Sequence, residues 1–99
     1  TGVQTCALPI YIASYSLLLH MIARITDLEP GEFIHSIGDA HIYLNAVDQV
    51  REQLERAPLP LPQLVIADRA QASIDDFVMD DFELEGYESH PALKAAMAV

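Results

Sequence analysis

A long apolar segment near the start of the chain is the feature that most limits its fold. The apolar side chains that recur there in steps of three and four belong to Ile12, Tyr15, Leu19, Ile22 and Ile25. This spacing predicts a helix over residues 11–28. Leu17, Leu18 and Met21 widen its apolar arc well beyond one stripe. A helix that is apolar nearly all round is a buried helix and needs cover on several sides, and a chain of 99 residues supplies little of it.

The composition agrees with an incomplete core. Hydrophobic residues make up 52% of the chain and charged residues 20%, which is too apolar for a disordered tail. So large an apolar share in a short chain indicates a piece of a larger domain or one face of an obligate oligomer. The net charge of -10 should repel nucleic acid and anionic membranes, so we expect neither as a partner. The apolar run over residues 12–25 is also shorter than the ~20 residues of a membrane-spanning helix.

The single cysteine, Cys6, excludes an internal disulfide framework and any cysteine-based zinc site. Cysteine use of this kind is typical of the cytoplasm, where we expect the protein to act. A nucleophilic cysteine needs a base and an electropositive pocket, and nothing near Cys6 in the sequence supplies either. We therefore assign no catalytic role to Cys6.

The rest of the chain alternates between extended and helical patterns. Leu8-Pro9 predicts a break before the first helix, and Pro30-Gly31 ends that helix. Asn45 is a good N-cap for an amphipathic helix that runs to about Arg56, and in this helix Glu52 and Arg56 are at i, i+4, the spacing of an ion pair. Strands are predicted within residues 32–44, which are interrupted at Gly38-Asp39, and over residues 64–67 and 82–86. The predicted fold class is a mixed α/β (α+β) piece with one buried helix, one amphipathic helix and three to four strands.

The best candidate site is the segment Gly38-Asp39-Ala40-His41-Ile42-Tyr43. The period of two along an extended chain puts His41 and Tyr43 on one face, where they point the same way. An imidazole and a phenol side by side suit a sugar hydroxyl or another small polar ligand. The alternative is a histidine and a tyrosine on a solvated strand face, and the spacing alone favours that alternative.

Other polar clusters give no site. Asp75-Asp76 and Asp80-Asp81 lack the glycine and the ligand spacing of a calcium loop, so a solvated acidic face is expected and no metal site is predicted. His20 lies within the first helix, where a histidine is more often a satisfied core residue than a ligand. His90 lies in the tail, where a surface role is the default.

An ordered set of segments resembles the thymidylate synthase family. The segments are Ile12-Ala13-Ser14-Tyr15, residues 28–35, Gly38-Asp39-Ala40-His41-Ile42-Tyr43-Leu44-Asn45, Asp48-Gln49-Val50, residues 60–64, residues 81–87 and residues 90–99. No single motif decides the resemblance, but the ordered set is specific and covers residues 11–99. It implies the C-terminal part of the thymidylate synthase fold.

The resemblance implies a chemistry and a set of site residues. The family methylates dUMP to dTMP with 5,10-methylenetetrahydrofolate, which gives both the carbon and the hydride. A cysteine adds to C6 of the pyrimidine, and the enolate captures the methylene at C5. His41 and Tyr43 match residues that hydrogen-bond the deoxyribose hydroxyl of dUMP. By position, Ala98 and its neighbours Met97 and Val99 would fold over the folate. The resemblance also implies a homodimer in the cytoplasm and no metal.

Departures from the family limit what this chain does alone. The catalytic cysteine of the family stands in a Pro-Cys-His setting that the chain lacks, so we expect a fragment that is inactive by itself. Residues 1–10 do not resemble the family, and a non-native leader joined to residues 11–99 is expected. Tyr11 stands where the family has the Asn that reads the base, and a relative acting on dCMP has Asp. A dCMP hydroxymethylase piece, or a non-catalytic fragment that docks on a full-length subunit, therefore stays open.

Overall fold

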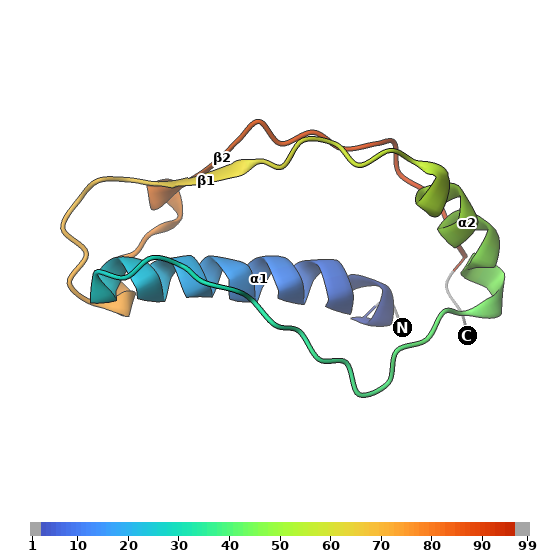
Figure 1. Cartoon of the computed structure of the whole chain (residues 1–99), viewed down its shortest axis with the longest axis horizontal. Helices are drawn as coiled ribbons and strands as arrows, with labels where there is room; N and C mark the ends of the chain where they lie inside the picture. Colours follow the sequence, from blue (N-terminus) through green and yellow to red (C-terminus); the bar gives the residue numbers. More distant parts are fainter. Residues whose placement is uncertain (1–2, 97–99) are drawn as a thin grey trace. The chain divides into compact units, whose positions relative to one another are not determined.

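The structure is a computed structural model that describes the backbone of residues 3–96 and the side chains of residues 9–96. Its elements in chain order are α1 (Val3–Thr26), the 3-10 helix η1 (Leu44–Ala46), α2 (Val47–Glu55), β1 (Gln63–Ile66), the 3-10 helices η2 (Ile74–Asp76) and η3 (Met79–Asp81), and β2 (Phe82–Glu85) (Figure 1). The two strands pair as an antiparallel sheet. The predicted mixed class of α and β elements is therefore confirmed. The prediction of three to four strands was wrong for the described residues, which form two.

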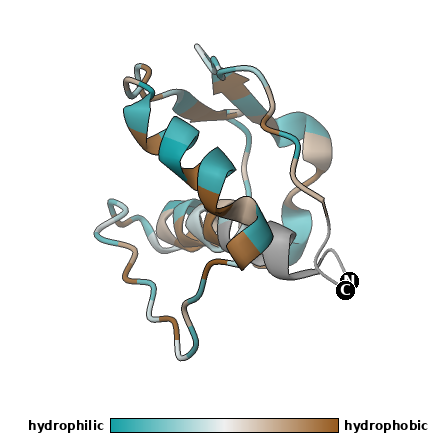
Figure 2. Ribbon diagram, turned by 90° about the vertical axis from the view of Figure 1, so that its right-hand side faces the viewer, coloured by the Kyte–Doolittle hydropathy of each residue, from teal (hydrophilic) through white to brown (hydrophobic). Residues whose placement is uncertain are grey.

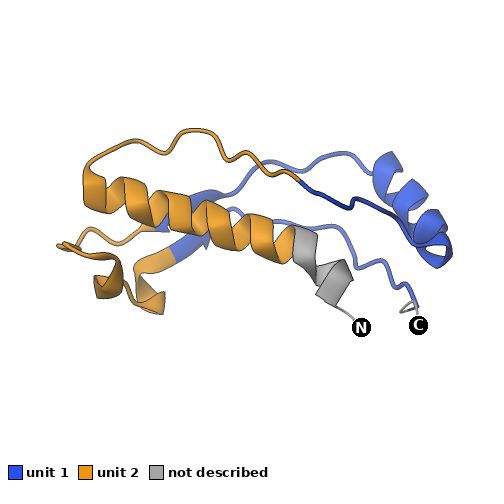
Figure 3. Cartoon of the chain, turned by 90° about the horizontal axis from the view of Figure 1, so that it is seen from below, with its two compact units in different colours: residues 1, 37–65, 83–99 blue, residues 2–36, 66–82 orange. Residues whose placement is uncertain are grey.

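The chain divides into two compact units. Among the described residues, unit 1 holds 37–65 and 83–96, and unit 2 holds 3–36 and 66–82 (Figure 3). Unit 1 thus contains α2, the candidate site segment and the C-terminal tail. Unit 2 contains α1 and the loop that carries η2 and η3.

Within unit 2, α1 runs through Pro9 instead of starting after it. The break predicted at Leu8-Pro9 was therefore wrong. Proline removes one backbone hydrogen bond and crowds the preceding turn, but its φ near −65° is itself helical. Helical geometry can therefore continue across Pro9 and join residues 3–8 to the apolar segment.

The C-terminal end of α1 is set by a left-handed residue. Asp27 has φ 54°, and the Leu28 amide donates to the Ala23 carbonyl at 2.9 Å, as in a Schellman motif. The Thr26 hydroxyl also donates to the Ile22 carbonyl at 2.8 Å. The helix therefore ends before Pro30-Gly31, the stop expected from the sequence.

Much of the apolar surface of α1 is uncovered. Ala23 is its one buried residue among those described, and Tyr15 is 53% exposed. Other large apolar side chains of α1 that stay exposed belong to Ile10, Tyr11, Ile12, Leu18 and Ile22. Figure 2 shows hydrophobic stretches along helices and extended segments alike. The sequence predicted a buried helix for which this chain has few partners, and within this chain the helix is indeed left largely uncovered.

Residues 28–43 form no strand, so the strands predicted within residues 32–44 were wrong. The backbone bends at Gly38-Asp39, as predicted. Every residue from 28 to 42 is exposed. A strand needs a neighbouring strand for its backbone hydrogen bonds, and this segment has none among the described residues.

Within unit 1, α2 begins at Val47 with Ala46 as its N-cap. The prediction of Asn45 as N-cap was wrong, because Asn45 lies inside η1 and makes no capping bond. The Arg56–Glu52 pair expected at i, i+4 is present, with Nη2 and Oε1 3.0 Å apart. β1 starts one residue before the predicted position, and Gly86 ends β2 with φ 68°, which glycine adopts without strain.

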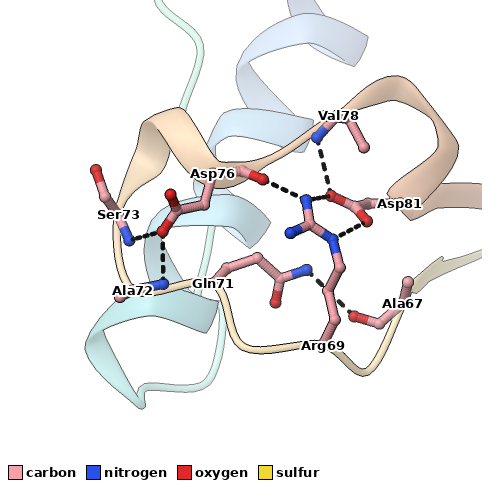
Figure 4. Close-up of polar contacts among 8 residues, drawn as sticks. All are labelled: Ala67, Arg69, Gln71, Ala72, Ser73, Asp76, Val78 and Asp81. Carbon is pink, nitrogen blue, oxygen red and sulfur yellow. Dashed lines mark hydrogen bonds and ion pairs between the residues drawn. The ribbon is translucent and has the colours of Figure 1, made fainter.

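The loop that joins β1 to β2, residues 67–81, belongs to unit 2. It is organised around Arg69 (Figure 4). Its Nε donates to Asp81 Oδ1 at 2.6 Å and its Nη2 to Asp81 Oδ2 at 2.5 Å, a two-bond ion pair. The Val78 amide adds a hydrogen bond to the same carboxylate at 2.9 Å, and Nη2 also donates to the Asp76 carbonyl. The bond from Arg69, and then that from Val78, lowers the pKa of Asp81 from 3.8 to about 2.

A second carboxylate closes the same loop. Asp76 Oδ2 accepts from the amides of Ala72 at 2.9 Å and Ser73 at 2.8 Å, and the Ser73 hydroxyl accepts from the Asp75 amide at 3.3 Å. The prediction of a solvated acidic face was therefore wrong for Asp81, which is buried, whereas Asp75, Asp76 and Asp80 are exposed. Both carboxylates accept backbone hydrogen bonds, and the side chain of Asp81 is only 4% exposed.

Candidate functional site

His41 and Tyr43 lie side by side in unit 1, as the sequence predicted. Their ring centroids are 5.1 Å apart with an interplanar angle of 79°, an edge-to-face arrangement. The two residues follow the bend at Gly38-Asp39 in a segment that is not part of a sheet. Period-two geometry therefore brings the rings together even though no strand forms.

A carboxylate orients the imidazole. His41 Nδ1 is 3.2 Å from Asp39 Oδ1. An ionised carboxylate only accepts, so Nδ1 is the donor of this pair, and in the Nδ1–H tautomer Nε2 is an acceptor. The sequence alone did not single out Asp39 as a partner, although its i, i+2 spacing from His41 was a usable signal.

The backbone of Tyr43 is held by the turn that follows it. The Tyr43 carbonyl accepts the Ala46 amide at 2.9 Å, and Tyr43 is the N-cap of η1. The Tyr43 side chain is half-buried, and that of His41 is 41% exposed. A phenol beside a reachable imidazole acceptor can hold a hydroxyl group of a ligand between them.

The C-terminal tail of unit 1 is held by side chains of η1 and α2. Asn45 Nδ2 donates to the Ala96 carbonyl at 3.1 Å, and Gln49 Nε2 donates to the Lys94 carbonyl at 3.1 Å. Sequence reasoning missed this role of Asn45 and Gln49, although two amides at i, i+4 were a possible signal. The predicted folate residue Ala98, with Met97 and Val99, lies outside the described residues.

A cavity of about 600 Å³ lies in unit 1 at the C-terminal end of α2. It is lined by the proline-rich connector over residues 57–62, by Gln53 and Arg56 of the helix end, and by residues 88–90 and Leu93 of the tail. His90, predicted to be a surface residue, is exposed and within hydrogen-bond distance of the Ala57 carbonyl, 2.8 Å from its Nε2. No pattern in the sequence predicted this cavity.

The remaining sequence candidates lie in unit 2. Tyr11 is exposed and stacks on Tyr15 with ring centroids 6.5 Å apart. His20 is half-buried in α1, and the side chain of Cys6 lies outside the described ones. Within the described residues, no group of His, Cys, Asp and Glu could hold a metal ion, and no helix is long and apolar enough to cross a membrane.

Similarity to known proteins identifies the family of this chain. A family model described as thymidylate synthase matches residues 4–99. The thymidylate synthase of Mycoplasma mobile is 59% identical over 99 residues, which are 100% of this chain and 34% of that protein. The human thymidylate synthase is 50% identical over 99 residues, 100% of this chain and 31% of that protein. That of Herpesvirus ateles is 58% identical over 91 residues, 92% of this chain and 31% of that protein.

The chain spans about a third of the length of these relatives. The expectation that residues 1–10 do not resemble the family was wrong for residues 4–10, because the family match begins at residue 4 and the Mycoplasma mobile relative aligns with the whole chain. A separate origin of that segment stays a prediction. The mixed helices and strands, the ordered motifs and the match over nearly the whole length agree. The chain belongs to the thymidylate synthase family.

Proposed function

We propose that this chain forms part of the nucleotide and folate sites of a cytoplasmic, homodimeric thymidylate synthase. The enzyme methylates dUMP to dTMP, with 5,10-methylenetetrahydrofolate as the donor of the carbon and the hydride, for de novo dTMP synthesis. The reaction needs no metal. A thiolate adds to C6 of the pyrimidine, and C5 then attacks the methylene carbon.

The observation that carries this proposal is the ring pair of His41 and Tyr43. In the proposed complex the deoxyribose hydroxyl of dUMP donates to His41 Nε2 and accepts from the Tyr43 phenol. Asp39 holds the Nδ1–H tautomer that this arrangement requires. The pair therefore positions the sugar and takes no part in bond making.

The folate site is proposed at the end of the chain. By its match to the family, Ala98 contacts the folate, and Met97 and Val99 close over it. Such closure excludes water from the reacting carbon. The cofactor residues come from the resemblance, and their test is separate from that of the nucleotide pair.

The 99-residue chain is proposed to be inactive by itself. Cys6 is its only thiol, and its flanking residues do not match the family setting of the nucleophile. A net charge of -10 also opposes a phosphate ligand until basic groups from other segments or a partner subunit join the site. Tritium release from 5-tritiated dUMP by the purified chain would contradict this part of the proposal.

The decisive experiment is a chimera in which residues 12–99 replace the corresponding stretch of the Mycoplasma mobile relative. We expect tritium release from 5-tritiated dUMP, and we expect His41→Ala and Tyr43→Phe each to raise the KM for dUMP. Tyr87→Phe is the matched control, because Tyr87 is an exposed tyrosine of unit 1 without an assigned role. A folded chimera in which neither site variant changes the KM for dUMP would overturn the assignment of the pair.

Base specificity is tested by the residue at position 11. A second chimera carries residues 11–99 of this chain and therefore has Tyr11. The first chimera keeps the residue of the Mycoplasma mobile relative at that position. We expect the second chimera to lose discrimination between dUMP and dCMP. If it instead processes only dCMP, the alternative of a dCMP hydroxymethylase relative is favoured.

A second candidate function is docking on a full-length synthase subunit without catalysis. The uncovered apolar side chains of α1, including Tyr15, Leu18 and Ile22, favour it, because such surfaces mark interaction sites. Binding of the 99-residue chain to a full-length synthase, and its loss in a Leu18→Lys variant, would support docking. Binding that survives this variant would remove α1 from the interface.

A further inference from the structure

One face of η1 and α2 donates a series of hydrogen bonds to the C-terminal tail of unit 1. Asn45, Gln49 and Arg56 donate to the carbonyls of the tail residues Ala96, Lys94 and Pro91, at 3.1, 3.1 and 2.6 Å. Successive donors move toward the C-terminal end of α2 while their acceptors move back along the tail. The tail therefore runs antiparallel to the helix.

The spacing of donors and acceptors matches over the whole series. Four residues separate Asn45 from Gln49, which is about 6 Å along a helix, and two residues of extended chain span about 7 Å. The seven residues from Gln49 to Arg56 span about 10 Å, as do three extended residues of the tail. The helix and the tail therefore remain in register from the first bond to the last.

The bonds involve only the backbone of the tail. The structure describes neither helix nor strand for residues 87–96, so these carbonyls take no part in the backbone hydrogen bonds of a helix or a sheet. Side-chain amides and a guanidinium supply the donors instead. The Arg56 guanidinium is itself held by Glu52 Oε1 at 3.0 Å. The side chains of Ala96, Lys94 and Pro91 take no part in these three bonds.

We propose that Asn45, Gln49 and Arg56 are positioning residues that hold residues 91–96 and so set where the end of the chain enters the folate site. We call these three residues the tail anchor. The part that concerns folate rests on the proposed function, because it assumes that Ala98 contacts the folate. The holding of the tail itself stands on the hydrogen bonds alone.

The tail anchor is also next to the nucleotide pair in the sequence. Asn45 follows Tyr43 by two residues, and both belong to the turn closed by the bond from the Ala46 amide to the Tyr43 carbonyl. One short segment therefore carries both Tyr43, a proposed ligand of the sugar, and Asn45, which donates to the tail carbonyl nearest the C-terminus. Only Leu44 separates the two residues along the chain.

The first test uses the 99-residue chain and needs neither nucleotide nor folate. Asn45→Asp and Gln49→Glu keep the side-chain shape but replace an N–H donor with a carboxylate that only accepts. We expect a carboxypeptidase to release the tail residues about two- to tenfold faster from each variant, the effect of one lost hydrogen bond. Gln53→Glu makes the same change at an exposed α2 residue outside the anchor and should leave the rate unchanged.

A rescue variant separates donation from general damage to α2. Gln49→Lys restores N–H donors at position 49, so the release rate should return toward that of the unsubstituted chain. Equal release rates for Asn45→Asp, Gln49→Glu and Gln53→Glu, at unchanged helix content, would overturn the tail anchor. If Gln49→Lys releases the tail as fast as Gln49→Glu, donation is not the cause and the proposal also fails.

A measurement on the unsubstituted chain keeps the test decisive if a variant does not fold. The side-chain amide protons of Asn45 and Gln49 should shift less with temperature in NMR spectra than those of Gln53, because the former are hydrogen-bonded. Similar temperature dependence for all three amides would contradict the anchor.

The role at the folate site is tested in the chimera that carries residues 12–99. Gln49→Glu should raise the KM for methylenetetrahydrofolate about two- to tenfold and leave the KM for dUMP unchanged. A merely structural role of Gln49 would instead lower kcat and affect both substrates. An inactive chimera would count against the proposed function, whereas the release rates and the amide spectra still decide on the anchor.

Discussion

Arg69 and Asp81 form a two-bond ion pair in which the carboxylate is almost fully enclosed and the guanidinium is partly exposed. The pair joins the loop after β1 to the residue just before β2, and the Ala67 amide donates to the Asp81 carbonyl at 2.8 Å beside it. The connection between this loop and β2 therefore depends on one charged carboxylate, that of Asp81.

The stability of unit 2 should depend on pH through Asp81. Its pKa in the folded chain is about 2, below the ordinary 3.8, so its stabilisation is fully present above about pH 4 and is lost as the pH falls through about 2. Asp81→Asn removes this charge. We expect its urea midpoint to lie below that of the unsubstituted chain at pH 6 and the difference to shrink toward pH 2. A difference that is constant from pH 6 to pH 2 would contradict the assignment.

Asp27→Gly should stabilise the chain by about 0.5–1 kcal/mol, because Asp27 holds a left-handed φ of 54° that glycine adopts without strain. Urea unfolding monitored by helix signal measures the change. Glu29→Gly is the control, since Glu29 has an ordinary φ and should give no gain. Asp27→Ala should destabilise, and a stabilising Asp27→Ala would show that φ at residue 27 is not the cause.

Asp39→Ala should weaken dUMP binding in the chimera without affecting folate. The change removes the acceptor that holds the Nδ1–H tautomer of His41, so Nε2 is no longer fixed as the acceptor. We expect the KM for dUMP to rise about two- to tenfold, the range of one hydrogen bond. Asp48→Ala is the matched control, because it removes an equally charged exposed residue away from the ring pair. An equal effect of the two variants would point to net charge instead.

The isolated chain should be weakly stable and should self-associate at micromolar concentration. The uncovered apolar side chains of α1 provide the attraction, and Ile22→Lys should reduce it by placing a charge among them. Analytical ultracentrifugation and thermal unfolding measure the two effects. A sharp cooperative melt of a monomer would contradict this expectation.

The sequence predicted best where a pattern is local. The apolar period of α1, the break at Gly38-Asp39, the Glu52–Arg56 pair and the approach of His41 to Tyr43 all follow from neighbours along the chain. These features need no knowledge of what lies across the fold. The wide apolar arc of α1 likewise predicted a helix that this chain alone cannot cover.

Prediction failed where a distant partner decides. Residues 32–44 have a strand pattern, but a strand requires a neighbour that the described residues do not provide. Asn45 has the composition of an N-cap, but its amide donates to a carbonyl 51 residues away. Asp81 was expected in water, and the guanidinium of Arg69 encloses it instead. Each error came from a contact that no local pattern records.

The backbone-only character of the tail anchor has a consequence for how the tail can vary. Because the donors contact carbonyl groups, which every residue has, the side chains of residues 92–96 are not restricted by the anchor. Substitutions there can alter what the tail presents to a ligand while leaving its course unchanged. Changes at Asn45 or Gln49 do the reverse and displace a tail whose own residues are intact. Placement and ligand contact are thus separable by mutation, the first in the helix and the second in the tail.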